Sequence, residues 1–304
     1  MAANKTRRAK KHLQQRLKAI HKTTAKYVPE PTFIKVNHIS LGDLRRKYSN
    51  KHVSIADDPE RMDTSKFKRC PPNSTQPLEI RGSDNGLLLY RFPAGSPELA
   101  QTLHETITRL PPTKKRKHKG LKRSTYTSRH YNLTCNSADE PYYTREYKDD
   151  GPLAEEFIEF NKPMWKRMAF VLGMKAPNLF RDVQLFDIPQ QWLCGAFSGC
   201  VINQGGLDVE KTTPHRDPRE PRESYAALTC TGVHSDGGLI LHDLHIIVEI
   251  NPGDTILFPD SIIYHSNKEV QGERNSVVCY TENNMYAYWK RKFGMKQREI
   301  KLKN

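Results

Sequence analysis

The second half of the chain alternates short apolar runs with turn-forming residues. The runs fall at about 182–188, 195–203, 224–231, 238–242, 244–250, 255–259, 262–265 and 275–282. Gly-Gly, Asn-Pro-Gly-Asp and Gln-Gly-Glu sequences lie between them and favour turns. Short runs with turns at this spacing predict a double-sheet jelly roll (a double-stranded β-helix) or a small barrel, rather than a sheet built from βαβ units.

Helical periodicity appears earlier in the chain, in two places. The segment at 97–110 has apolar residues every three or four positions, with Ser96 as the N-cap and Pro97 as the first helical residue. The segment at about 153–173 has the same spacing, and Pro163 is expected to kink or split it.

The remaining N-terminal part has little periodicity. Residues 28–80 are rich in Pro, Asp and Ser and predict an irregular arm that wraps the core, followed by a strand at 86–90. We therefore expect an α+β protein whose jelly-roll core is flanked by helices. Its expected parts are a basic, partly disordered tail and arm (1–80), a catalytic domain (81–290, core at 180–290) and a basic C-terminal tail (291–304).

Positive charge is concentrated in three stretches. The formal net charge is +15, and residues 1–27, 114–123 and 290–303 carry nine, seven and seven Lys or Arg with a single acid among them. Such clusters favour a polyanion, and nucleic acid is the commonest one. Solvated charge is the alternative for the N-terminal stretch. The run 114–117 also resembles a nuclear import signal, so we expect a nuclear protein.

Several classes of protein are excluded by composition. No run approaches the roughly 18 apolar residues of a membrane helix, and the N-terminus is too basic for a signal peptide. The six cysteines are scattered without C-x-x-C spacing, which argues against a zinc ribbon or disulfide scaffold. No membrane and no protein partner are expected.

A metal-binding pattern lies within the strand-rich half. His215 and Asp217 form a His-x-Asp pair, His265 follows 48 residues later, and Arg274 follows after nine more. Two imidazoles and one carboxylate on one face of a metal form the facial triad of non-haem Fe(II) oxygenases. An interior arginine in the next strand suits a second carboxylate, that of an oxo-acid.

A cupin is the nearest structural alternative. The segment Gly253–Pro259 followed by a histidine resembles the second cupin motif, but cupins usually supply His-x-His and a Glu where this chain has Asp217. The other histidines of this half, His234, His242 and His245, are expected to be surface or hydrogen-bonded strand residues.

The wider sequence resembles the fungal branch of the TET/JBP dioxygenases. The likeness rests on CVINQG, TTPHRD, GGLILHDLHIIVEINPGDTILFPDSIIYHSN and ERNSVVCYTENNMYAYW, within residues 180–290. It implies an enzyme that uses Fe(II), 2-oxoglutarate and dioxygen to oxidise the methyl group of a modified DNA base. It also implies double-stranded DNA with a flipped base as the partner, with the three basic stretches on its phosphates.

The resemblance assigns roles to individual residues. It implies His215, Asp217 and His265 as the metal ligands and catalytic centre, and Arg274 and Ser276 as contacts to 2-oxoglutarate.

The same resemblance implies substrate contacts. Tyr280 matches a tyrosine that packs against the flipped base, and Asn203 aligns with a recurring Asn of the fungal branch. Two positions depart from the animal enzymes: Glu282 replaces a base-contacting His, and Glu220 replaces an Asn. The base therefore stays open, with 5-methylcytosine first and N6-methyladenine and thymine as alternatives.

Other substrates and one other class of protein stay open too. An RNA base or a protein side chain would suit the same chemistry. A catalytically inactive nucleic-acid-binding module is the alternative outside enzymes. The sequence leaves open the extent of oxidation, the sequence context and the oligomeric state.

Overall fold

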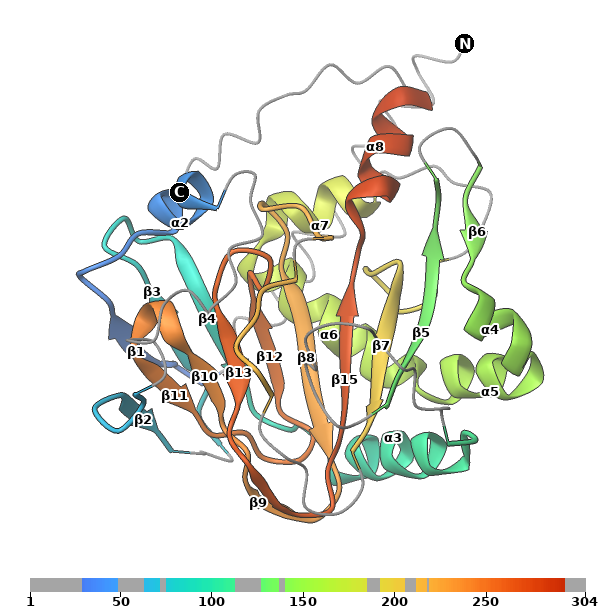
Figure 1. Ribbon diagram of the computed structural model, residues 1–304, viewed down its shortest axis with the longest axis horizontal. Coiled ribbons are helices and arrows are strands. Elements are labelled where there is room, and N and C mark those ends of the chain that lie inside the picture. Colours follow the sequence, from blue (N-terminus) through green and yellow to red (C-terminus); the bar gives the residue numbers. More distant parts are fainter. Residues whose placement is uncertain are drawn as a thin grey trace.

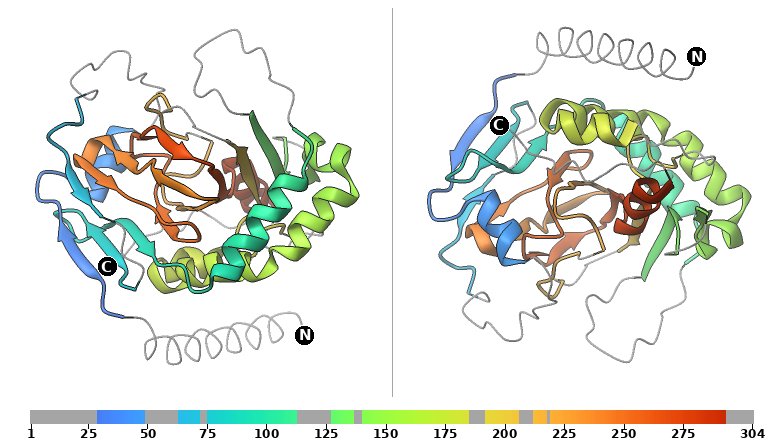
Figure 2. Two further views of the ribbon diagram at one scale, coloured as in Figure 1. Left: turned by 90° about the horizontal axis from the view of Figure 1, so that it is seen from below. Right: turned by 90° about the horizontal axis from the view of Figure 1, so that it is seen from above.

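A large sheet with a smaller sheet on one face and helices on the other forms the protein (Figures 1 and 2). The computed structural model describes residues 29–48, 63–71, 75–112, 127–136, 140–184, 192–205, 212–217 and 219–292. This arrangement agrees with the predicted α+β class and its two-sheet core.

The large sheet has nine strands, and all neighbouring pairs are antiparallel except the first. In spatial order they are β1 (Thr32–Lys35), β3 (Leu78–Arg81), β4 (Leu87–Phe92), β12 (Thr255–Phe258), β8 (Ala226–Thr231), β15 (Asn275–Tyr280), β7 (Gly199–Gln204), β5 (Thr127–Thr134) and β6 (Tyr142–Tyr143).

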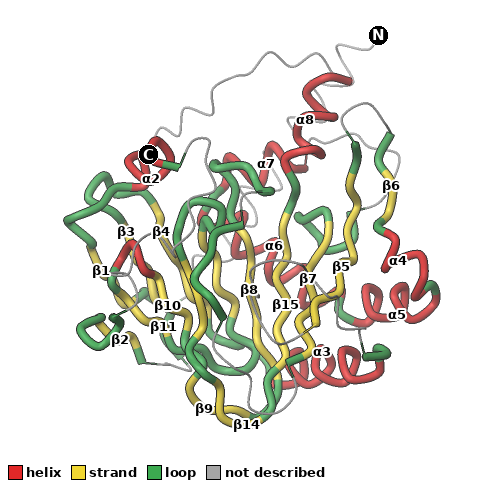
Figure 3. Tube along the Cα trace, viewed as in Figure 1, coloured by secondary structure: helices red, strands yellow, loops and turns green. Residues whose placement is uncertain are grey.

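The smaller sheet has four strands, and a separate hairpin lies at one end of the molecule (Figure 3). The four strands are β13 (His265–Asn267), β10 (Leu239–Leu241), β11 (Ile246–Val248) and β2 (Lys68–Cys70). The hairpin pairs β9 (His234–Asp236) with β14 (Val270–Gly272).

Seven α-helices complete the described part of the chain. They are α2 (Leu41–Lys47), α3 (Pro97–Arg109), α4 (Arg145–Asp150), α5 (Pro152–Phe160), α6 (Lys162–Lys175), α7 (Pro177–Gln184) and α8 (Asn283–Lys292). The helix at 97–110 is confirmed as α3. The break at Pro163 is confirmed as well, because α5 ends at Phe160 and α6 begins at Lys162.

Strand β15 shows how the two faces of the large sheet differ. Val277 and Cys279 point to the helical side and belong to the same apolar cluster as Trp165 of α6. Val278, between them, packs on the other cluster, which lies between the two sheets. Successive strand residues face opposite sides, so Arg274, Ser276 and Tyr280 are directed to the space between the sheets.

Two predictions about local structure are wrong. The segment at 28–80 is not uniformly irregular, because β1, α2, β2 and β3 lie within it. These elements are short and depend on distant partners, such as the parallel pairing of β1 with β3. The run at 182–188 does not begin as a strand, because residues up to Gln184 belong to α7, where Leu179 and Val183 are buried one turn apart.

The other predicted strands correspond to β4, β7, β8, β10, β11, β12, β13 and β15, with ends shifted by a few residues. The largest shift is at 195–203, where the strand starts only at Gly199. The basic stretches at 1–27 and 114–123, and nearly all of 290–303, lie outside the described residues. The division into tails and one catalytic domain stays a prediction.

Candidate functional site

Three predicted ligands converge at the edge of the space between the sheets. One ligand atom from each of His215, Asp217 and His265 lies within 4.8 Å of the other two. The Nε2 atoms of His215 and His265 are 3.9 and 3.6 Å from the same oxygen, Oδ2 of Asp217. In the described part of the chain this is the one group of three or more His, Cys, Asp or Glu side chains arranged to hold a metal ion.

Backbone hydrogen bonds bring these distant residues together. His215 and His265 exchange two bonds, each amide N donating to the other's carbonyl O at 2.9 Å. The amide of Asp217 donates to the carbonyl of Asp260 at 3.2 Å. The segment that carries His215 and Asp217 therefore pairs with the start of β13 through an antiparallel β-bridge.

Each histidine is oriented by its own loop. Nδ1 of His215 lies 2.8 Å from the carbonyl of Thr213, and Nδ1 of His265 lies 3.0 Å from that of Ile263. A carbonyl can only accept, so Nδ1 carries a proton in each ring, and Nε2 is the nitrogen that faces Asp217. This arrangement suits metal binding, because a metal-ligating histidine usually donates its other N–H in this way. Two imidazoles and a carboxylate fit a divalent transition metal with open positions.

The charges around the ligands favour a cation. Burial alone would lower the pKa of His265, but the carboxylates of Asp217 and Asp260 outweigh it and raise the pKa. Burial together with neighbouring carboxylates raises the pKa of Asp260 to about 8 and that of Glu220 well above its usual value. Protons and a metal ion therefore compete for one acidic site.

Arg216, between the two ligands of the His-x-Asp pair, is held by aromatic rings. Its guanidinium carbon lies 3.6 Å from the ring centroid of Tyr48 and 4.7 Å from that of Tyr264. Asp243 holds both tyrosines: it accepts a 2.9 Å bond from the Tyr48 hydroxyl and a 2.7 Å bond from the Tyr264 amide. Tyr48 ends α2, so the N-terminal arm takes part in fixing the ligand segment. We call Arg216, Tyr48, Tyr264 and Asp243 the arginine clamp.

Arg274 is a buried cation on the inner face of the large sheet. Its side chain donates to the carbonyl of Gly237 at 2.5 Å, and the thiol of Cys230 lies beside it. No carboxylate oxygen of the described residues lies within 4.0 Å of it, although the residue is only 8% exposed. A buried guanidinium without a carboxylate partner is costly, and an anionic ligand would offset that cost.

The structure places Ser276 and Asn203 together and Tyr280 apart from them. Ser276 and Asn203 are direct partners between β15 and β7, and the Asn203 amide donates to the Ser276 hydroxyl at 3.2 Å. Tyr280 lies four residues further along β15, where its hydroxyl accepts a 3.4 Å bond from Asn132. Burial, then the charges of Glu282 and Glu220, raise its pKa. Asn203 thus neighbours the predicted oxo-acid contact, and Tyr280 lies towards Glu220.

Sequence reasoning assigned no role to two residues of this region. Asp260, 1% exposed, lies behind Asp217, and nothing in its local sequence marks it. His234 was expected to be an ordinary strand residue, yet both its ring nitrogens are buried near Arg274. Only the pairing of β9 with β14 brings it there, and no short-range pattern reveals such a pairing.

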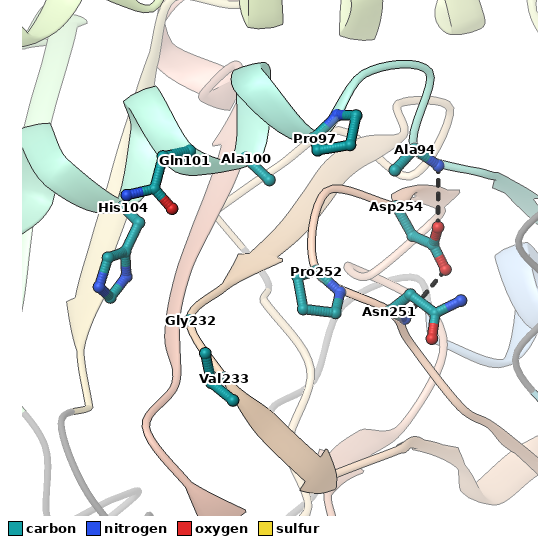
Figure 4. A pocket seen from close by; sticks show the side chains of 10 residues that line it. All are labelled: Ala94, Pro97, Ala100, Gln101, His104, Gly232, Val233, Asn251, Pro252 and Asp254. Carbon is teal, nitrogen blue, oxygen red and sulfur yellow. Dashed lines mark hydrogen bonds between the residues drawn. The ribbon is translucent and has the colours of Figure 1, made fainter.

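A cavity of about 710 Å³ lies between α3 and two turns at the ends of strands (Figure 4). It is lined by α3 residues, including Pro97, Ala100 and His104, and by the turns around Val233 and Pro252. None of the predicted site residues lines it. The candidate site is therefore identified by the converging ligand atoms of the triad and not by this cavity.

Comparison with known proteins supports the fold. No protein-family model and no curated protein matches the chain. Solved structures that resemble it include NgTET1 in complex with 5mC DNA, with 14% identity, a TM-score of 0.55 and coverage of 81% of this chain and 89% of that one. Another is an oxidoreductase of the 2OG-Fe(II) oxygenase family from Burkholderia pseudomallei, with 10% identity, a TM-score of 0.39 and coverage of 84% and 96%. The first likeness shows a shared fold.

The described residues contain no helix long and apolar enough to cross a membrane. All six cysteines lie in the described part of the chain, where they are buried and form no disulfide bond.

Proposed function

We propose that the protein is an Fe(II)- and 2-oxoglutarate-dependent dioxygenase that oxidises the methyl group of a modified DNA base, with 5-methylcytosine as the first candidate. One observation carries the proposal: a two-histidine, one-carboxylate triad and a buried arginine without a carboxylate partner among the described residues lie on the same interior space. A metal with open positions and a dicarboxylic oxo-acid are what these two features suit.

The triad residues would hold the iron, and Arg274 would hold the far carboxylate of 2-oxoglutarate. His215 and His265 present Nε2 because their Nδ1 protons are bonded to backbone carbonyls. The bound iron supplies the dioxygen chemistry of such enzymes. The protein fixes the geometry: Arg274 sets the direction of the oxo-acid, and the two sheets exclude water.

Tyr280 would line the substrate side of this space. It is 7% exposed, and its hydroxyl is held by Asn132. A base methyl lies inside the duplex, so the nucleotide must leave the stack at a cost of a few kcal/mol. The basic stretches at 1–27, 114–123 and 290–303 would offset that cost through phosphate contacts, and a nuclear location is part of the same proposal.

The choice of a DNA base rests on two supports. The structure of similar fold, NgTET1, is in complex with 5mC DNA. The strongly basic stretches favour a polyanion. Three alternatives remain: an RNA base as the substrate, a protein side chain as the substrate, and an inactive module that only binds nucleic acid. The test below distinguishes them from oxidation of a DNA base. Membership of the fungal branch of the TET/JBP family is part of the proposal.

The test is product analysis on defined duplexes. The full-length protein with Fe(II), ascorbate and 2-oxoglutarate is incubated with duplexes carrying 5-methylcytosine, N6-methyladenine or unmodified bases, and nucleosides are read by mass spectrometry. We expect oxidised methylcytosine with the wild type and with E159A, which removes an exposed carboxylate of α5. We expect none with H265A. Loss of N6-methyladenine alone, or oxidation of thymine, would change the base, and no product on any duplex would overturn DNA as the substrate.

Binding to DNA has its own test. The association constant for a duplex should fall steeply between low and moderate salt, because each phosphate contact releases counterions. Replacing Lys114, Lys115, Arg116 and Lys117 by serine should flatten that dependence. A salt-independent affinity would show that the basic stretches do not contact phosphates.

A further inference from the structure

Two arginines from distant parts of the chain meet where α2 contacts the loop that follows Asp217. Nε of Arg45 donates to the carbonyl of Arg222 at 3.2 Å, and Nη1 of Arg222 donates to the carbonyl of Arg45 at 3.0 Å. Both residues are half-buried, so salt screens their charges less than it would on an open surface. The contact therefore brings two positive charges to one place.

Neither guanidinium has an acidic partner in the described part of the chain. No carboxylate oxygen of these residues lies within 4.0 Å of Arg45 or Arg222. The acidic side chains of this region have other partners, because Asp43 pairs with Arg46 and Asp84 accepts from two backbone amides at the start of α2. Two adjacent cations without a counter-charge favour the binding of an anion.

The acid in the same loop does not neutralise them either. Glu223 follows Arg222, and its charge acts on Tyr286 of α8. Burial, and then the charges of Glu220, Asp182 and Glu223, raise the pKa of that tyrosine. Glu223 therefore lies toward α8 and forms no ion pair with the two arginines.

Support of the helix end accounts for only part of this arrangement. The carbonyl of Arg45 belongs to the last turn of α2, where backbone carbonyls lack helical partners, and Arg222 supplies one donor to it. A neutral side chain could give the same bond. Each guanidinium has five N–H donors and spends one on the other's carbonyl, which leaves donors for a ligand.

The loop that carries Arg222 is fixed at several points. The carbonyl of Pro221 accepts a 3.2 Å bond from the hydroxyl of Ser261, and the carbonyl of Arg219 accepts a 2.8 Å bond from the amide of Asn283. The positions of the loop arginines are thus set before a ligand binds, which lowers the entropy cost of binding.

The same loop reaches the substrate side of the candidate site. Burial raises the pKa of Tyr280, and the positive charge of Arg219 opposes this shift, so the exposed Arg219 lies near that tyrosine. At the other end, Arg45 lies one helical turn before Tyr48 of the arginine clamp. Arg219, Arg222 and Arg45 therefore extend from the substrate side towards the segment that holds the metal ligands.

A phosphate diester is the anion that suits these arginines. A guanidinium offers parallel N–H donors to two phosphate oxygens and keeps its charge at physiological pH. A nucleotide that leaves the stack stays joined to its strand, so the phosphates on either side of it lie at the rim of the pocket that takes the base. We propose that Arg45, Arg219 and Arg222 bind these flanking phosphates. This inference rests on the proposed function, because it needs a nucleic acid whose base enters this site.

The experiment measures binding of a duplex with one 5-methylcytosine to the full-length protein loaded with Mn(II), by fluorescence anisotropy at several salt concentrations. R45Q and R222Q each remove a charge but keep an N–H donor for the other's carbonyl. For each we expect about tenfold weaker binding at moderate salt, and a dependence of log K on log salt that is shallower by about one. R145Q removes an exposed arginine of α4, which pairs with Asp149, and should match the wild type in both measurements.

Two further measurements separate phosphate binding from support of the fold. R222K keeps the charge, so its salt dependence should equal that of the wild type, and R45Q and R222Q should keep the Mn(II) affinity and melting temperature of the wild type. A neutral methylphosphonate beside the 5-methylcytosine should weaken wild-type binding by about tenfold. The same replacement should weaken binding by the double variant R219Q/R222Q little further.

Two negative results would overturn this inference and leave the proposed function standing: binding by R45Q and R222Q that equals that of R145Q, or wild-type binding that is unaffected by a methylphosphonate on either side of the base. Loss of Mn(II) affinity or of melting temperature together with DNA binding would overturn it too, because the arginines would then support the fold. If the wild type binds no duplex even at low salt, DNA fails as the substrate and the inference fails with it.

Discussion

The two ends of the space between the sheets differ in how many partners the protein itself provides for their polar side chains. At the metal end, the outer nitrogen of each histidine is bonded to a carbonyl, and the ligand segment is fixed by backbone pairing and by the arginine clamp. At the other end, the Arg274 guanidinium has the carbonyl of Gly237 and the thiol of Cys230 beside it, and it forms no ion pair with a carboxylate of the described residues.

This difference assigns different tasks to the two ends. The metal end is organised by the protein before anything binds, so its loss should remove the metal and everything that depends on it. The Arg274 end is organised for an anion, so its loss should remove the oxo-acid and spare the metal. The first three predictions below test that separation, and the fourth concerns a buried ion pair elsewhere in the large sheet.

Loss of a metal ligand should have the largest effect. H265A removes one of three donors, and we expect Mn(II) affinity to fall by about a hundredfold or more. Competition with a metal-sensitive dye measures this. E159A should bind Mn(II) as the wild type does, and an H265A affinity within threefold of wild type would contradict the assignment of the triad.

Loss of the buried arginine should have an effect nearly as large, but only on the affinity for 2-oxoglutarate. R274L leaves the far carboxylate without its charged partner, so we expect about a hundredfold weaker 2-oxoglutarate binding with Mn(II) affinity unchanged. R274K keeps the charge but loses the planar guanidinium, so its affinity for 2-oxoglutarate should lie between those of the wild type and R274L. Simultaneous loss of metal binding in R274L would show that the two ends are not separate.

The arginine clamp should have a smaller effect, on the metal end only. Y48L removes the ring that packs on Arg216, and we expect Mn(II) affinity to fall by about tenfold. Y48F keeps the ring and loses only the bond to Asp243, so its loss should be smaller. Equal Mn(II) affinity in Y48L and wild type would mean that the arm does not position the ligands.

Glu79 in the large sheet differs from Arg274 because its oppositely charged partners are part of the protein. The effect expected from its loss is the smallest of the four. Glu79 in β3 lies 2.5 Å from both Lys175 and Arg81. Burial would raise the pKa of Glu79, but bonds to Lys175 and Arg81 outweigh it and lower the pKa. A lowered carboxyl pKa stabilises the fold above the unfolded pKa of about 4.5, and this contribution is lost as pH falls through the lower folded value.

E79Q should therefore melt below the wild type at pH 7, and the difference should shrink as pH falls below 4.5. Thermal melting followed by circular dichroism across that range measures it. A difference that stays constant with pH would mean that Glu79 acts through packing and not through its charge.

Spacing in the sequence is enough to select His215, Asp217 and His265, whose ligand atoms the structure brings within 4.8 Å of one another. A His-x-Asp pair and a distant histidine can be recognised whatever the loop lengths between them. Their role as metal ligands stays a prediction. Arg274 follows from the same spacing, and the placement of Ser276 and Tyr280 on its face follows from strand alternation. His234 could not be found in this way. Its burial depends on a three-residue hairpin and on the glycine turn that brings Arg274 beside it.

Elements without local periodicity were missed for a related reason. Strand β1 exists because it pairs with β3, more than forty residues later. Helix α2 has seven residues and is fixed by the Ser40 N-cap and by the burial of Leu41 and Leu44. The sequence at the end of α7 predicts the start of a strand, because over so short a run the apolar residues do not distinguish the helical period from the strand period.

The most direct test of the whole account is the release of succinate from 2-oxoglutarate by the full-length protein with Fe(II) and ascorbate. We expect slow release by the wild type, faster release when a methylated duplex is added, and none with H265A or R274L. Release that persists in H265A, or no release from the wild type under any condition, would contradict the central claim that this space holds iron and 2-oxoglutarate for oxidation.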